Sequence, residues 1–138
     1  MRIVRTDAET SARMARIRQK GTKIEAAVAS ALRDLGLHYR KNVRKLPGSP
    51  DFANRSKRWA VFVHGCFWHH HTGCYKATIP KSNRRFWLEK FRDNKRRDAR
   101  SARLLRREGY RVLVIWECQE RRIRDKLTKI LEPSRINS

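Results

Sequence analysis

The stretch WAVFVHGCFWHHHTGC, residues 59–74, joins an apolar run to a segment rich in histidine and cysteine. Its first five residues form one of the two longest apolar runs of the chain, which predicts a strand buried on both faces. Turn-forming residues precede this run at positions 46–50 and 54–57, so we expect it to be the second strand of a hairpin. The histidines and cysteines then follow the end of a rigid strand, where side chains are well positioned to form a site.

The segments around this strand predict an α/β fold with one domain. Thr22 and Glu25 have the spacing of a capping box, and apolar residues at helical spacing continue to Gly36. A long helix is expected over residues 82–108, a second buried strand over 110–116, and a closing helix before Pro133. A strand, a long helix and a strand in succession indicate a crossover, hence a mixed central sheet flanked by helices.

The charge of the chain points to a polyanion as its partner. Lys and Arg number 35 against 13 Asp and Glu, a formal net charge of +22 in 138 residues, and eleven of the basic residues lie between positions 84 and 107. We interpret residues 1–20 as a basic N-terminal arm and residues 21–138 as the folded domain. No signal peptide and no run of about 20 apolar residues is present, so we expect an intracellular protein without a membrane span.

The cysteines and histidines have the composition of a structural zinc site. Cys66, His71 and Cys74 lie close together in the sequence, and Cys118 lies at the end of the second predicted strand, which in a mixed sheet can lie next to the first. Four protein ligands fill a tetrahedral zinc site and leave no open position for catalysis. His70 is an alternative ligand to His71 from spacing alone, and three ordinary buried thiols are the simpler interpretation.

The residues that zinc does not use suggest phosphodiester hydrolysis. Asp51 follows Pro50 at the start of a strand, a position typical of a carboxylate that binds Mg²⁺, although Pro-Asp is also common in turns. His64 and His69 lie close in sequence to the predicted metal loop, and a neutral imidazole can activate a water. Glu25 has a simpler role as the partner of Thr22 in the helix cap.

Several aromatic residues lie among cationic ones, as they do in proteins that stack on or wedge between bases. We expect Phe67 and Trp68 to serve this purpose and not to be packed, because a zinc loop is a poor place to bury two consecutive large rings. Trp87 precedes the most basic segment, and Met14 is an apolar residue in the arm without an obvious core.

Four runs of the sequence resemble the very short patch repair (Vsr) DNA mismatch endonucleases. These runs are LPGSPDF at 46–52, FVHGCFWHHHTGC at 62–74, FWLEK at 86–90 and VIWEC at 114–118. The resemblance covers residues 14–127. It implies a fold like that of the type II restriction endonucleases and a bacterial hydrolase that nicks one DNA strand at a T:G mismatch left by deamination of 5-methylcytosine. It also implies a monomer in the cytoplasm, associated with the nucleoid and paired with a cytosine-5 DNA methyltransferase.

The resemblance also implies a role for each candidate site residue. Asp51 and the backbone carbonyl of Val63 would bind a catalytic Mg²⁺, His69 would act as general base, and His64 and Glu25 would support the hydrated metal. The structural Zn²⁺ ligands would be Cys66, His71, Cys74 and Cys118, and the residues that wedge into DNA would be Met14, Phe67, Trp68 and Trp87.

Two departures from the family pattern concern these same segments. Val63 stands where many relatives have Thr, which a backbone contact tolerates, and the spacer between His71 and Cys74 is one residue longer than the shorter version of the family. The alternative to a nuclease is a zinc-stabilised nucleic-acid-binding module without catalysis. That alternative explains charge, zinc and aromatic residues, but it does not explain Asp51 together with His69.

Overall fold

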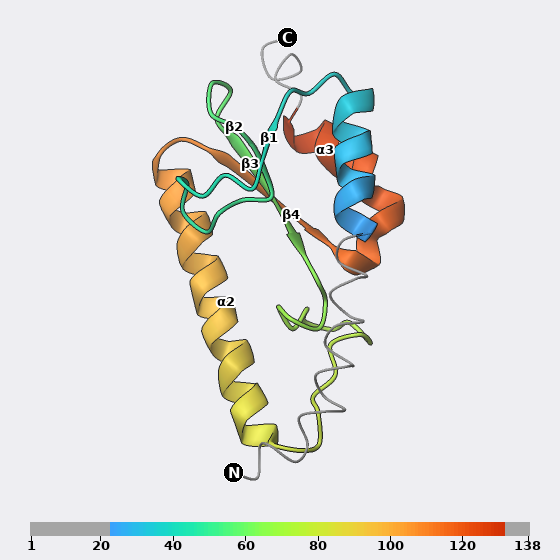
Figure 1. The fold of residues 1–138 in the computed structure, drawn as a ribbon, viewed down its shortest axis with the longest axis vertical. Helices are drawn as coiled ribbons and strands as arrows, with labels where there is room; N and C mark the ends of the chain where they lie inside the picture. Colours follow the sequence, from blue (N-terminus) through green and yellow to red (C-terminus); the bar gives the residue numbers. More distant parts are fainter. Residues whose placement is uncertain (1–22, 132–138) are drawn as a thin grey trace.

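The computed structural model describes residues 23–131 and shows an α/β fold with a mixed sheet between helices (Figure 1). Its elements are a helix over residues 23–34, β1 (Arg40–Lys41), β2 (Phe52–Asn54), β3 (Trp59–His64), α2 (Arg84–Arg107), β4 (Arg111–Trp116), the 3-10 helix η1 (Glu117–Arg122) and α3 (Ile123–Leu131). This order confirms the predicted fold class. Thr22 and the arm over residues 1–20 lie outside the described residues.

The sheet has the strand order β1-β2-β3-β4, with one parallel pair. β1, β2 and β3 pair antiparallel in succession, which confirms the predicted hairpin. β3 and β4 are parallel, with Trp59 opposite Arg111 and His64 opposite Trp116, and α2 is the crossover between them. The carboxyl ends of β3 and β4 therefore meet at one edge of the sheet, so the residues that follow His64 lie beside those that follow Trp116.

The two faces of the sheet have separate cores. On one face, Phe52, Trp59 and Val61 pack against the helix of residues 23–34 and against α3, which lie together on that side of the sheet in Figure 1. On the other face, Ala60 and Phe62 pack against Leu105 of α2. Every residue of β3 is buried, as the apolar run predicted.

β4 differs from the prediction of a strand buried on both faces. Leu113 and Ile115 are buried against the helix of residues 23–34 and α3, but Val112 and Val114 are only partly buried on the α2 side. β4 is the edge strand of the sheet among the described residues. α2 therefore covers only part of the β4 face that carries Val112 and Val114. An apolar run in the sequence does not distinguish a half-covered edge strand from a central one.

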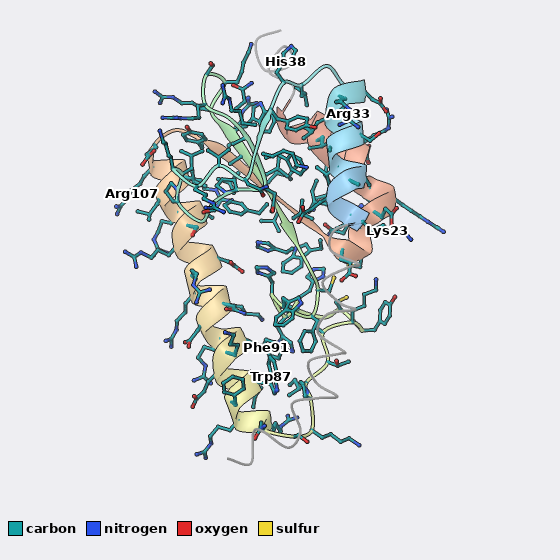
Figure 2. All side chains as sticks on the ribbon, in the orientation of Figure 1. Lys23, Arg33, His38, Trp87, Phe91 and Arg107 are labelled. Atoms are coloured by element: carbon teal, nitrogen blue, oxygen red, sulfur yellow. The ribbon has the colours of Figure 1, made fainter. Side chains whose placement is uncertain are left out.

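The amino-terminal half of α2 extends beyond the sheet and forms a third core with the loop after β3 (Figure 1). Figure 2 shows Trp87 and Phe91 on this half of the helix, and both are buried with Phe67 of the loop. At the opposite half, Gly48 has a φ of +76° and approaches Ser101 so closely that a Cβ would lie 2.6 Å from the Ser101 Cβ. This contact holds the turn that precedes Asp51 against α2.

No helix within residues 23–131 is long and apolar enough to cross a membrane.

Candidate active site and metal centre

The predicted zinc ligands gather at the edge where β3 and β4 end. One ligand atom from each of Cys66, His71, Cys74 and Cys118 lies within 4.8 Å of the others. The Nδ1 atom of His71 lies 3.6 Å from the Cys66 Sγ and 3.4 Å from the Cys118 Sγ. The parallel register explains this approach, since Cys66 and Cys118 each lie two residues beyond a paired position of the two strands.

His71, and not His70, is the histidine that faces the thiols. The His71 ring stacks on Trp116 with centroids 3.9 Å apart, which fixes its orientation. Burial, together with the charges of Lys126 and Lys95, lowers the pKa of His71, so the neutral form that binds metals is favoured. His70 has a positive φ and turns away to stack on Phe91, with centroids 4.4 Å apart.

A buried glutamate joins the two segments that carry the thiols. Glu117 accepts a hydrogen bond from the backbone N–H of Cys66 through its Oε1 at 3.3 Å, and its Oε2 lies 3.9 Å from the Lys76 Nζ. Burial raises the pKa of the Cys66 thiol to about 12, and the neighbouring thiols of Cys118 and Cys74 contribute to this rise. Crowded thiols with a neutral imidazole are the donor set of a structural zinc site, so the residues fit that ion.

Asp51 lies where β2 begins, next to the carboxyl end of β3. Its Oδ2 accepts a hydrogen bond of 2.6 Å from the backbone N–H of Val63. Burial raises the pKa of Asp51 to about 6, and the negative charge of Glu25 contributes to the rise. A half-buried carboxylate with a second carboxylate nearby gains from a bound divalent cation, so this position fits Mg²⁺.

His64 and His69 stack on each other beside Asp51. Their rings are nearly parallel, with centroids 3.7 Å apart. His64 is the last residue of β3, and burial is the main cause that lowers its pKa to about 4, so it is neutral near pH 7. His69 lies in the loop, which the bond from its backbone N–H to the Gly65 carbonyl folds back towards the strand.

The residue that the sequence analysis missed is Asp98 of α2. Its Oδ2 lies 2.6 Å from the Nδ1 of His69. Burial alone would raise the pKa of Asp98, but the hydrogen bond with His69 and the charges of His64 and His69 outweigh it and lower the pKa. Asp98 follows Asn94 by one helical turn, and the Asn94 amide donates a hydrogen bond to the Trp68 carbonyl at 3.0 Å. One face of α2 therefore contacts two successive residues of the loop, Trp68 and His69.

The aromatic residues lie next to this site, but the expectation that Phe67 is unpacked is wrong. Phe67 is 2% exposed and meets Trp87 and Phe91 edge to face, with centroids 5.8 and 5.3 Å away. The long α2 supplies a small core for the loop, which a sequence does not reveal. Trp68 is half-buried at the margin of the same cluster, Trp87 is buried, and Met14 lies outside the described residues.

Comparison with known protein families identifies the chain. The profile of the family described as DNA mismatch endonuclease Vsr matches residues 3–76, more than half of the chain. The chain belongs to the Vsr family. The DNA mismatch endonuclease Vsr of Escherichia coli is 44% identical over 125 residues, which cover 91% of this chain and 79% of that protein.

Two further Vsr relatives are named as nicking enzymes. The type II nicking enzyme V.XorIIP of Xanthomonas oryzae is 41% identical over 124 residues, 88% of this chain and 90% of its own length. The type II nicking enzyme V.NmeAIP of Neisseria meningitidis is 42% identical over 114 residues, 83% of this chain and 81% of its own. This Vsr-family chain is thus a hydrolase that nicks DNA in repair, and a module without catalysis is not favoured.

Proposed function

We propose that this enzyme nicks one strand of duplex DNA beside a T:G mismatch, with Mg²⁺ as cofactor and His69 as general base. The observation that carries the proposal is the 2.6 Å contact between the His69 Nδ1 and the Asp98 Oδ2. A carboxylate at Nδ1 fixes the ring and the tautomer, which leaves the other nitrogen, Nε2, free to accept a proton.

His69 takes the proton of the attacking water. As the water oxygen bonds to phosphorus, the proton of the water passes to Nε2 of His69, one P–O bond of the backbone breaks, and the leaving sugar oxygen takes a proton from solvent. Asp98 stabilises the imidazolium that forms, because its carboxylate accepts the Nδ1–H. Removal of such a base lowers rates by about 10²- to 10⁴-fold.

Asp51 and the backbone carbonyl of Val63 are the groups we assign to Mg²⁺, with Glu25 near Asp51. Bound there, Mg²⁺ would polarise a phosphoryl oxygen and neutralise developing charge. The support is the half-buried Asp51 carboxylate, whose pKa is raised by burial and by the charge of Glu25, so that a bound cation would stabilise its charged form. Asp51 holds its position through the Val63 N–H, so the carboxylate is oriented before any ion binds.

His64 would hold, as a neutral donor or acceptor, a water beside the position assigned to Mg²⁺. Its pKa of about 4 keeps it uncharged at the pH of a cell, and its stacking on His69 limits how far the base can move. A neutral ring next to a cation avoids the repulsion that an imidazolium would cause.

Mismatch recognition is assigned to the aromatic residues. Trp68 lies at the margin of the cluster of Phe67, Trp87 and Phe91, which offers a rigid platform for a base pair that opens easily. Met14 is proposed to enter from the opposite groove. T:G pairs arise when 5-methylcytosine is deaminated, so a cytosine-5 DNA methyltransferase is the proposed functional partner, with the enzyme acting as a monomer.

The zinc group has a structural role in this proposal. Cys66, His71, Cys74 and Cys118 would hold one Zn²⁺ that fixes the loop between His64 and α2. The loop carries both the general base His69 and Trp68, so the ion would fix the position of the base relative to the residue that contacts the mismatch.

The test is nicking of three otherwise identical duplexes that contain T:G, T:A or C:G at one position. We expect Mg²⁺-dependent nicking of one strand of the T:G duplex alone. A protein that binds the T:G duplex tightly but never cleaves it would support the binding-module alternative.

A further inference from the structure

Three potential ligands besides the Cys₃His group lie close together at the edge of the sheet where β3 and β4 end, which we call the catalytic edge. His64 at the end of β3, His69 in the loop and Asp98 on α2 each offer one ligand atom, and these atoms lie within 4.8 Å of one another. The Nδ1 of His64 is buried and has no hydrogen-bond partner among the residues that the structure describes. The rings of His64 and His69 are stacked with centroids 3.7 Å apart, so one ring must tilt out of the stack for both nitrogens to reach a single ion.

The chemistry of this trio differs from that of both metal positions already assigned. Two imidazoles and one carboxylate suit Zn²⁺, Co²⁺ and Ni²⁺, whereas Mg²⁺ prefers an all-oxygen shell with several waters. The Cys₃His group is rich in thiolate, and Asp51 offers oxygen alone. We propose that His64, His69 and Asp98 form a second, nitrogen-rich site that binds one transition-metal ion and thereby switches the enzyme off.

Binding at this site requires a proton to move. The 2.6 Å contact places the Nδ1 proton of His69 between that nitrogen and the Asp98 carboxylate. When the ion bonds to Nδ1, this proton moves to Nε2 of the same ring, the Asp98 oxygen becomes a ligand, and His64 joins as a neutral imidazole. No oxidation takes place, and His69 stays a neutral imidazole, so the net reaction releases no proton.

The ion has a route to the site. A cavity of about 450 Å³ is lined by all three ligand residues, together with Lys95 and Trp116. The charge of Lys95 opposes a cation, so we expect reversible binding that is weaker than binding at the thiolates. Weaker binding is what a site needs to respond to an excess of free ion.

Inhibition is the functional consequence, and this part rests on the proposed function. An ion on Nδ1 takes the place of the Asp98 partner and leaves the ring proton on Nε2, so the His69 ring no longer accepts the proton of water. Because the ligand sets differ, more Mg²⁺ should not relieve the inhibition.

The experiment adds Co²⁺ to the zinc-loaded protein without DNA and follows binding by calorimetry and absorption. We expect one further equivalent of bound Co²⁺, with weak d–d bands and no thiolate-to-cobalt charge transfer. No further equivalent, or intense sulfur bands that show exchange at the thiolates, would overturn the proposal.

Variants identify the site. Loss of a residue that only hydrogen-bonds to a metal ligand weakens metal binding about 10- to 100-fold. Because His64 and Asp98 would be ligands themselves, His64→Asn and Asp98→Asn should each weaken the affinity for the second metal ion by at least about 100-fold. The first zinc should stay bound in both variants. His38→Asn, an exposed histidine outside the catalytic edge, should bind the second ion as the wild type does. Unchanged binding in both site variants would refute the assignment, and so would loss in His38→Asn. Binding without inhibition would contradict the functional part alone.

Discussion

The Nδ1 of His69 and the Oδ2 of Asp98 lie 2.6 Å apart, although 29 positions separate the two residues in the chain. α2 brings them together because its amino-terminal half packs on the loop after β3 through Trp87 and Phe91. The catalytic edge therefore depends on this helix as well as on the two central strands.

Asp98→Asn should reduce single-turnover nicking by about 10²- to 10⁴-fold, because the amide no longer fixes the tautomer of His69. Binding of the T:G duplex should change little. Asp93→Asn, an exposed acidic residue on the same helix, is the control and should nick normally. Wild-type nicking by Asp98→Asn would show that the contact has no part in the reaction.

Asp51→Asn should abolish nicking yet stabilise the fold. The pKa of Asp51 is raised from 3.8 to about 6, so the native state holds its proton more tightly, and stability is lost as the pH rises from about 4 through 6. At pH 8 without Mg²⁺, the amide should raise the free energy of unfolding by up to about 3 kcal/mol, and at pH 3.5 by much less.

Denaturant unfolding at the two pH values measures this effect, with Asp34→Asn, an exposed residue outside the catalytic edge, as the control. A variant that is less stable than the wild type by the same amount at both pH values would contradict the account. Added Mg²⁺ should stabilise the wild type at pH 8 but not Asp51→Asn.

His71→Ala should lose the bound zinc, whereas His70→Ala should retain it. Only His71 faces the Cys66 and Cys118 thiols, while His70 stacks on Phe91. Zinc content after purification without chelator decides between them. If His70→Ala is the variant that lacks zinc, the assigned ligand set is wrong.

Phe67→Ala should reduce the stability of the protein, whereas Trp68→Ala should reduce its discrimination between mismatched and matched DNA. Phe67 is buried among aromatic rings, so its truncation should destabilise the protein by about 3–5 kcal/mol. Trp68→Ala should fold but bind T:G and T:A duplexes with more similar affinity, because the wedge is missing. Phe86→Ala, 51% exposed, is the control for loss of a ring near the cluster.

Titration of both duplexes by fluorescence anisotropy, together with thermal unfolding, separates the two effects. If Trp68→Ala precipitates or unfolds while its soluble fraction still discriminates, Trp68 is a packing residue.

The sequence predicted the parts of this protein that follow from local pattern. Residues 59–63 predicted the buried strand, and the strand, helix, strand order predicted the parallel pair that brings Cys66 to Cys118. The structure also separates His71 from His70, because Trp116 and Phe91 each stack on one of the two rings. Spacing alone contains no information on those contacts.

Two features could not be predicted because they arise from tertiary packing. Asp98 lies among eleven basic residues of a helix, where an acidic residue is usually a surface partner of its neighbours. The one feature of the sequence that points to a role for Asp98 is its position, because it lies on the same helical face as Trp87, Phe91 and Asn94. The burial of Phe67 depends on the length of α2 beyond the sheet, which an apolar pattern does not specify.

The most direct test of the account is single-turnover cleavage of a T:G duplex with each strand labelled in turn, in Mg²⁺, by the wild type and by His69→Ala. We predict a single nick beside the mismatch in one strand, absent from the matched duplex, and a loss of about 10²- to 10⁴-fold in His69→Ala with its zinc retained. Equal cleavage of the matched duplex, or nicking by His69→Ala at the wild-type rate, would contradict it.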